Sequence, residues 1–218
     1  IFDERESEWE LLDDDYKSPL PKYLRWRTWA ANPEGMTGTE LKDFIDNTLF
    51  PKLQELPAKG GDQRAYVIRN VFQDAYNYMK SGQLIRQVIN KIEEGVHFNK
   101  AKERHLFGDM YEQLLRDLQA AGNAGEFYTP RAVTEFMVRM TNPRLNEKIM
   151  DPACGTGGFL TCAIENVRKK DVKTVEDEEL LQSCIFGIEK KPLPHLLCTT
   201  NMILHGIDVP SNIKHDNS

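Results

Sequence analysis

Several features that would place this 218-residue sequence in a familiar class are missing. No apolar run reaches the roughly 20 residues that a membrane-spanning helix needs, and no secretory signal opens the chain. The four cysteines show no Cys-x-x-Cys spacing and the five histidines form no His-Glu-x-x-His pair, so neither a zinc site nor a disulfide framework is expected. We therefore expect a cytoplasmic protein, not bound to a membrane, that holds no metal and keeps its thiols reduced.

Positive charge is also in short supply. The chain has 28 Lys and Arg residues against 34 Asp and Glu residues, which gives a formal net charge of −6. This balance opposes strong autonomous binding to nucleic acid, which relies on neutralising phosphates. If the protein acts on DNA, a partner must supply much of the affinity.

The most informative stretch present is a glycine-rich turn. Residues 151–159 read Asp-Pro-Ala-Cys-Gly-Thr-Gly-Gly-Phe and follow the apolar run Lys148-Ile149-Met150. Apolar residues at helical spacing come next, namely Leu160, Ala163, Ile164 and Val167. This order predicts a strand, a turn and a helix. Because Gly155, Gly157 and Gly158 allow close backbone approach, and a helix N-terminus offers free N–H groups, the first hypothesis is a nucleotide-like ligand.

The spacing of the turn argues against two common nucleotide sites. No Lys-Ser or Lys-Thr pair follows the glycines, which excludes a P-loop. A dinucleotide fingerprint would have its third glycine where Leu160 stands. A nicotinamide-binding oxidoreductase is therefore only an alternative.

A second apolar run, residues 184–188, ends at Glu189. A carboxylate at the carboxyl end of a neighbouring parallel strand can accept both hydroxyls of a ribose. Taken alone, Glu189 is equally well interpreted as a solvated charge at a strand end, beside Lys190 and Lys191. Together with the glycine turn, it favours an adenosine-type site.

The hydrophobic period changes near residue 125. Before it the pattern is helical, with helices expected over 39–56, 62–79, 81–94 and 102–121. After it strands and helices alternate. Thr129 is expected to cap a helix that starts at Pro130 and buries Val133, Phe136, Met137 and Met140. We expect an α-helical N-terminal domain over 1–124 and the first part of an α/β Rossmann-like domain over 125–218.

These motifs carry a family resemblance. Residues 151–159 resemble the first S-adenosylmethionine motif of amino-methylating DNA methyltransferases. Residues 125–131, Gly-Glu-Phe-Tyr-Thr-Pro-Arg, resemble the motif that precedes it in the adenine-modifying group. The spacing between the two, the long helical N-terminal region and the stretch 201–208, Asn-Met-Ile-Leu-His-Gly-Ile-Asp, are similar to the modification (M, HsdM) subunit of type I restriction–modification systems. The resemblance covers essentially the whole chain.

The resemblance implies an adenine-specific DNA methyltransferase that uses S-adenosyl-L-methionine as cofactor and methylates a flipped-out adenine directly. It also implies that DNA is bound through a complex with a specificity (S) subunit, a restriction (R) subunit and two modification subunits. The residues of this chain that it marks as cofactor-binding are Glu126, Phe127, Tyr128, Thr129, Pro130, Arg131, Asp151, Gly155, Thr156, Gly157, Gly158, Glu189 and Asp216.

Several of these residues can be given roles within the resemblance. Backbone N–H groups of the turn should do most of the holding, while Asp151 either meets the ammonium group of the cofactor or braces the loop. Thr129 is expected to hydrogen-bond near the methionine part. Arg131 either holds a carboxylate or is a solvated side chain of the first helical turn, so it ranks below Thr129. Cys154 has no His partner in the sequence and is interpreted as a packing thiol.

The family's Asn-Pro-Pro-Phe/Tyr motif, which polarises the adenine amine, does not occur in this sequence, so no catalytic residue is assigned. Residues 212–218 resemble the approach to the motif that contacts the cofactor adenine, which points to Asp216 or Asn217. The chain does not begin with Met and shows only two clear strands, so we expect a fragment of a longer protein. A non-enzymatic assembly module, in which residues 1–124 dock a specificity or restriction subunit, is an alternative that can coexist with the enzyme.

Overall fold

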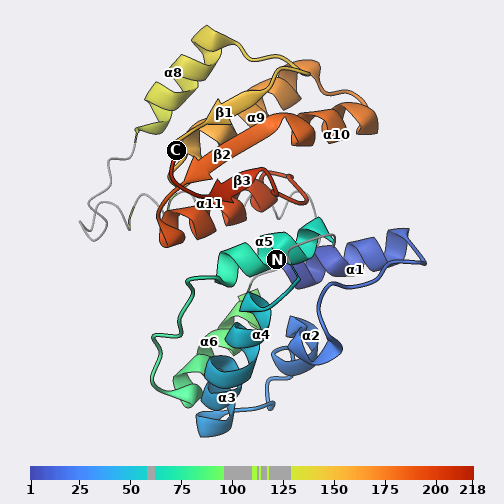
Figure 1. The fold of residues 1–218 in the computed structure, drawn as a ribbon, viewed down its shortest axis with the longest axis vertical. Helices are drawn as coiled ribbons and strands as arrows, with labels where there is room; N and C mark the ends of the chain where they lie inside the picture. The colour runs from blue at the N-terminus through green and yellow to red at the C-terminus, as the bar shows by residue number, and fades with distance from the viewer. Residues whose placement is uncertain (58–61, 96–109, 112, 114–116, 118–128) are drawn as a thin grey trace. The chain divides into compact units, whose positions relative to one another are not determined.

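The chain forms two compact units, Ile1–Glu103 and Arg104–Ser218, and each is described by itself. The computed structural model describes residues 1–57, 62–95, 110, 111, 113, 117 and 129–218 (Figure 1). The expected domain boundary at residue 124 and most of the helix expected over 102–121 lie outside these residues, so both stay predictions. Within the described ranges, no helix combines the length and the apolar character that crossing a membrane requires.

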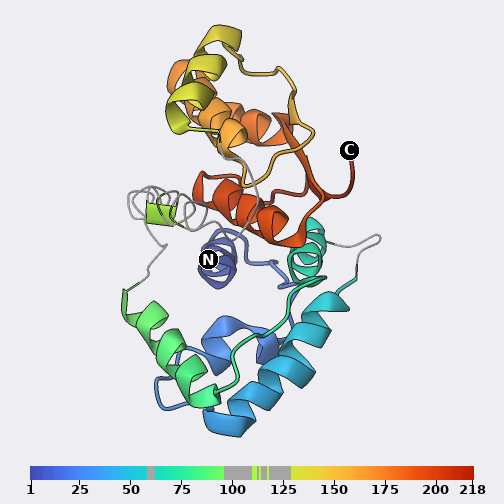
Figure 2. The ribbon, with the colours of Figure 1, turned by 90° about the vertical axis from the view of Figure 1, so that its left-hand side faces the viewer.

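The first unit is built from helices. They are α1 (Phe2–Leu12), the 3-10 helix η1 (Lys22–Leu24), α2 (Trp26–Trp29), α3 (Gly38–Phe44), the π-helical segment η2 (Ile45–Leu49), α4 (Phe50–Gln54), α5 (Gln63–Phe72) and α6 (Gly82–Gly95). Segments α3, η2 and α4 follow one another without a break, which confirms the helix expected over 39–56 (Figure 2). Helix α6 confirms the prediction over 81–94. Helix α5 ends at Phe72, short of the predicted residue 79.

The core of the first unit lies along the α3–η2–α4 run. Leu41, Ile45, Leu49 and Leu53 are buried and stand four residues apart, so they share one face of the helix. They pack in one cluster with buried residues of α2, α5 and α6, which include Trp29, Ala65, Ile68, Ile85 and Ile89. The helices bury this shared face against one another. The described part of the first unit therefore forms a core without any strand.

Two charged side chains are buried inside the first unit. Glu6 of α1 is fully buried and accepts hydrogen bonds from Nη2 of Arg27 at 2.9 Å and from the hydroxyl of Tyr16 at 3.2 Å. Arg86 of α6 donates to the carbonyl oxygens of Met36 at 2.8 Å, Ala30 at 2.9 Å, Asn32 at 3.1 Å and Trp29 at 3.2 Å. Each buried charge is thus compensated within the unit.

The second unit is a parallel α/β arrangement. Its elements are α8 (Arg131–Thr141), β1 (Ile149–Asp151), α9 (Gly158–Asp171), α10 (Val175–Cys184), β2 (Ile185–Glu189), α11 (Pro192–Leu204) and β3 (Ile213–His215). The strand order is β1-β2-β3 with both pairs parallel; Asp151 lies opposite Gly187, and Glu189 lies opposite His215. The predicted strand, turn and helix around the glycines are confirmed, as is the strand that ends at Glu189.

Helices α9 and α11 cover one face of this sheet. Helix α9 contacts β1 and β2, α11 contacts β2 and β3, and the two helices contact each other. Their shared core includes Leu160, Ile164, Val167, Ile185, Cys198, Met202 and Ile213. On the opposite face Met150 is 53% exposed. The outer edge of β1 pairs with no strand in the described part of the chain.

The predicted buried face and the predicted N-cap of helix α8 are both wrong. Its apolar residues Val133, Phe136, Met137 and Met140 are all exposed, because the helix instead packs Thr134 and Val138 onto α9, where Cys162 and Ala163 are buried. The cap also differs. The carbonyl of Pro130 accepts the first helical hydrogen bonds, from Val133 and Thr134. Pro130 is therefore the N-cap and Thr129 lies one residue outside the helix.

Candidate functional site

The candidate site lies where the three parallel strands end. The glycine turn follows β1, Glu189 is the last residue of β2, and Asp216 follows β3 directly. Parallel strands bring their carboxyl ends to the same edge of a sheet, and ligands of open α/β sheets bind in the crevice there. The fold therefore brings together Asp151, the glycine turn, Glu189 and Asp216, as the sequence analysis expected.

The two left-handed glycines of the turn have different surroundings. Gly157 has φ +86°, and a Cβ atom there would lie 2.9 Å from Sγ of Cys198 and from Cε of Met202. Gly155 has φ +53°, and a Cβ atom there would meet nothing within 4 Å. Gly157 is thus needed for packing onto α11. Gly155 faces open space that a ligand can occupy.

Backbone hydrogen bonds fix the turn to the sheet. The N–H of Cys154 donates to the carbonyl of Ile188 at 2.9 Å, and the N–H of Gly157 donates to the carbonyl of Cys154 at 2.7 Å. Helix α9 then begins at Gly158 with no side-chain cap. The N–H groups of its first turn have no acceptor within the helix, so they are available to an anionic or polar ligand.

Glu189 binds the turn through its carboxylate. Its Oε2 accepts from the N–H of Gly155 at 2.9 Å, and its Oε1 accepts from the N–H of Lys191 at 2.7 Å. Glu189 is therefore more than a solvated charge at a strand end. Because a carboxylate offers about four lone-pair sites, each oxygen retains acceptor capacity for a ligand hydroxyl.

The other two acidic residues flank this carboxylate. The N–H of Asp216 donates to the carbonyl of Glu189 at 3.1 Å, which places Asp216 beside the end of β2. The carboxylate of Asp216 accepts from the N–H of Asn217 at 2.7 Å. Asp151 accepts from the N–H of Ala153 at 3.1 Å and so braces the start of the turn.

The segment before α8 is described only in part. Thr129 and Pro130 directly precede this helix. Arg131, its first residue, pairs with Glu135 at 3.1 Å and with Glu165 at 2.6 Å. The carboxylates that Arg131 holds are thus side chains of this protein. Residues 126–128, Glu-Phe-Tyr, lie outside the described residues, so their expected cofactor contacts stay predictions.

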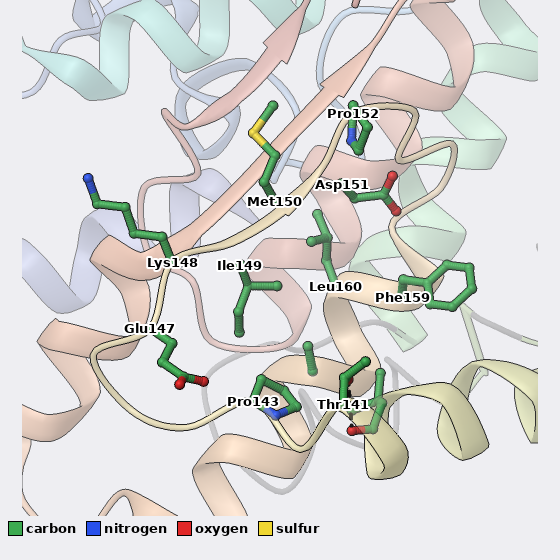
Figure 3. A pocket seen from close by; sticks show the side chains of 12 residues that line it. Thr141, Pro143, Glu147, Lys148, Ile149, Met150, Asp151, Pro152, Phe159 and Leu160 are labelled. Carbon is green, nitrogen blue, oxygen red and sulfur yellow. Dashed lines mark hydrogen bonds between the residues drawn. The ribbon is translucent and has the colours of Figure 1, made fainter.

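A cavity of about 450 Å³ lies beside the turn, on the open edge of β1. Its walls come from α8, the loop between α8 and β1, β1 itself and the first turns of α9. Figure 3 shows Asp151, Phe159 and Pro143 among the side chains around it. Neither Glu189 nor the three glycines line it. The cavity therefore adjoins the strand-end site at Asp151 and does not coincide with it.

Cys154 lies beneath the turn, where its Sγ is 3.7 Å from Sγ of Cys198. Both thiols are buried. The hydrogen bond to Cys154 and burial raise the pKa of the Cys198 thiol. Burial of both thiols is in keeping with the packing role expected for Cys154.

Sequence reasoning missed the hydrogen bonds that α11 makes to the turn. The amide Nδ2 of Asn201 donates to the carbonyl of Thr156 at 3.1 Å, and Asn201 is 1% exposed. Thr156 is itself buried. The signal available in the sequence was an Asn among the apolar residues Met202, Ile203 and Leu204, since a polar side chain that becomes buried requires a partner. The stretch 201–208 was noted only for its family resemblance.

Two family models match the chain. The model described as N-6 DNA Methylase matches residues 102–218, and the model described as HsdM N-terminal domain matches residues 2–92. The two matched ranges fall on opposite sides of the division between the compact units, except for residues 102 and 103.

The chain is also similar to curated and solved relatives. The type I restriction enzyme EcoEI methylase subunit of Escherichia coli is 60% identical over 219 residues, which cover 100% of this chain and 44% of that protein. A modification subunit of a putative type I restriction enzyme from Vibrio vulnificus YJ016 has a TM-score of 0.83 at 43% identity, over 99% of this chain and 48% of that one. A chain from the type I R-M system, solved to explain complex assembly, has a TM-score of 0.81 at 37% identity, over 99% and 43%. The chain thus spans less than half the length of these relatives.

Proposed function

The chain belongs to the N-6 DNA methylase family, and from this we propose that it is the cofactor-binding part of a type I restriction–modification methylase subunit. The proposed reaction transfers the methyl group of S-adenosylmethionine to the N6 amino group of adenine at a specific site in DNA. One observation carries the proposal: an open glycine turn and a strand-end carboxylate, at Gly155 and Glu189, meet at the edge of a parallel sheet.

The residues present fit this cofactor. Glu189 has acceptor capacity for the two ribose hydroxyls, and the N–H groups at the start of α9 suit a polar or anionic group. In this proposal Asp151 would meet the ammonium group, and Asp216 or Asn217, which follow β3, would contact the adenine. The open space at Gly155 lets the ligand approach the backbone. The cofactor would supply an electrophilic methyl group bonded to sulfur.

The proposal places DNA recognition outside this chain. A net charge of −6 is a poor basis for binding phosphates alone, so specificity and restriction subunits are the proposed partners, with two modification subunits in the complex. The helical first unit, which matches the HsdM N-terminal model, is the proposed docking module. The base would be flipped out of the duplex to reach the methyl group.

The nicotinamide alternative gains no support. Leu160, which stands at the third glycine position of a dinucleotide fingerprint, is 1% exposed and packs in the core of the second unit. NAD therefore serves as the control ligand in the test of this proposal.

Calorimetric titration of S-adenosylmethionine into the natural gene product tests the proposal, with Gly155→Asn and Glu189→Gln as variants. Asn tolerates the left-handed region better than other side chains, so Gly155→Asn fills the open space with little strain. Gly38→Asn is the matched control, because Gly38 of the first unit has φ +58° and equally open surroundings.

We expect saturable binding that Gly155→Asn weakens at least about tenfold, since the ligand loses its close approach to the backbone. Glu189→Gln should weaken it by a similar factor, and Gly38→Asn should leave it unchanged. Binding of NAD in preference to S-adenosylmethionine, or of neither by a folded protein, would overturn the proposal.

A further inference from the structure

Besides Glu189, the side chain of Asn201 also binds the glycine turn. Asn201 of α11 donates from Nδ2 to the carbonyl of Thr156, while the N–H of Gly157, in the same peptide unit, donates to Cys154. A peptide unit is planar, so bonds at its carbonyl and its N–H together fix its orientation. Because this peptide unit is bound to Asn201 and Cys154, the next N–H groups, at the start of α9, remain directed toward the proposed cofactor site.

Asn201 is in turn connected to His205, one helical turn later. The ring Nδ1 of His205 lies 2.9 Å from the carbonyl oxygen of Asn201, and only the ring nitrogen can be the donor in this bond. The other ring nitrogen, Nε2, lies 3.3 Å from Oε1 of Glu165 on α9. His205 is buried, so its ring bridges α11 and α9 out of contact with bulk water.

The connection continues to the start of α8. Glu165 accepts from Nη2 of Arg131 at 2.6 Å, and Arg131 directly follows Thr129 and Pro130. A chain of contacts thus runs from Arg131 through Glu165 and His205 to Asn201 and the carbonyl of Thr156. Its two ends are the two sequence motifs expected to surround the cofactor, and its middle belongs to neither.

We propose that Asn201 and His205 are positioning residues that set the glycine turn and the start of α8 in one arrangement. The inference rests on the proposed function for its ligand, but the arrangement of the turn can be measured without one. Asn201 orients the peptide unit between Thr156 and Gly157, and the pair of His205 with Glu165 couples this orientation to Arg131. Neither side chain is assigned contact with the cofactor or the adenine.

The variant Asn201→Leu tests the inference, because leucine is of similar size and cannot donate to Thr156. Thr199→Val is the matched control: Thr199 is a buried polar residue of the same helix whose Oγ1 has no hydrogen-bond partner in the described part of the chain. Both are made in the natural gene product. The readouts are amide hydrogen exchange at residues 155–160 without ligand and the affinity for S-adenosylmethionine.

We expect Asn201→Leu to speed exchange at the turn and to lower the affinity about tenfold or more, with Thr199→Val like the unaltered protein in both. Unchanged exchange at the turn would overturn the inference whether or not the ligand binds. If the unaltered protein does not bind S-adenosylmethionine while Asn201→Leu still loosens the turn, the proposed function fails and the positioning role stands.

A second variant covers the case in which Asn201→Leu does not fold. Glu165 has a side chain that is 43% exposed, so Glu165→Gln disturbs the core less while it removes the carboxylate that lies beside His205 and pairs with Arg131. We expect faster exchange at residues 155–160, with a smaller affinity loss of about two- to fivefold. In the double variant with Asn201→Leu, the loss of binding free energy should be smaller than the sum of the losses in the two single variants. Strict additivity would show that the two side chains act separately.

Discussion

The buried charges of the helical unit and the strand-end carboxylates of the parallel α/β unit have different hydrogen-bond partners. In the first unit, Glu6 accepts hydrogen bonds from Arg27 and Tyr16. The guanidinium of Arg86 donates to backbone carbonyls within residues 29–36. In the second, the carboxylates of Glu189 and Asp151 accept from backbone N–H groups of the turn at the sheet edge. Glu6 and Arg86 are thus buried, whereas Asp151 and Glu189 are only partly buried.

This difference indicates which charged groups can still bind a ligand. A buried charge that is compensated on all sides stabilises a particular fold and has no capacity left for a ligand. A carboxylate that binds two N–H groups keeps lone pairs, and the N–H groups of the adjoining helix start remain without helical acceptors. The second unit therefore carries the proposed cofactor site, and the first is suited to structure and docking.

A glycine substitution in each unit is expected to have the largest effect and tests the difference between the two units most directly. We expect Gly157→Ala to destabilise the second unit by about 2–5 kcal/mol, since it combines left-handed strain with a clash at Cys198 and Met202. Gly38→Ala in the first unit adds the strain alone, about 1–2 kcal/mol. Hydrogen exchange measured by mass spectrometry reports the opening free energy of each unit. Equal losses would show that the packing beneath Gly157 is not tight.

Removing the buried guanidinium of the first unit should have the next largest effect. Arg86→Met removes the donor to the carbonyls of residues 29, 30, 32 and 36, of which that of Asn32 still accepts from the N–H of Gly35, and should lower the stability of this unit by about 2–4 kcal/mol. S-adenosylmethionine affinity should not change if the units divide their roles as proposed. Arg86→Lys is the control, because an ammonium group cannot span all four acceptors and should restore only part of the loss.

The smallest expected effect is a dependence on pH that belongs to the second unit. Burial, together with the neighbouring His215, lowers the pKa of His195, whose ring stacks on His215 at 5.1 Å between centroids. The folded state therefore keeps His195 neutral, while the unfolded chain takes up a proton below about pH 6.5. Stability from this group is present above that pH and is lost as the pH falls.

Thermal unfolding at pH 7.5 and at pH 5.5 measures this effect. His195→Gln should reduce the difference in Tm between the two pH values, whatever its effect on Tm itself. His195 belongs to the second unit, so His195→Gln should leave the opening free energy of the first unit, obtained from hydrogen exchange, unchanged at both pH values. If the difference in Tm between the two pH values were the same in the variant, the titration of His195 would not be its cause.

Local patterns in the sequence predicted the centre of the second unit. Residues 148–167 gave a strand, a glycine turn and a helix, and the run before Glu189 gave a second strand; the structure confirms each element. These predictions succeed because apolar periodicity and glycine content are properties of neighbouring residues. The side of α8 that is buried was predicted wrongly, because periodicity counts apolar residues and does not register the contact of Thr134 with Cys162.

Other features depend on residues far apart in the sequence. Strand β3 is only three residues long and has one buried apolar residue, Ile213, too little for a period of two to be seen. The bond from Asn201 to Thr156 joins residues 45 positions apart, and that from Gly155 to Glu189 joins residues 34 positions apart. Such contacts follow from the strand order and the register, which a single sequence does not reveal. The cofactor roles of the individual site residues stay predictions.

The bond from Gly155 to Glu189 has a consequence for how a ligand would associate. Ordering the backbone of a loop costs roughly 1–2 kcal/mol per residue. Here that entropy is lost when the protein folds, because the carboxylate already ties the turn to β2. A ligand that arrives meets a preorganised surface and keeps more of its contact energy as affinity. Association should therefore proceed with little movement of the turn and without a slow closing phase.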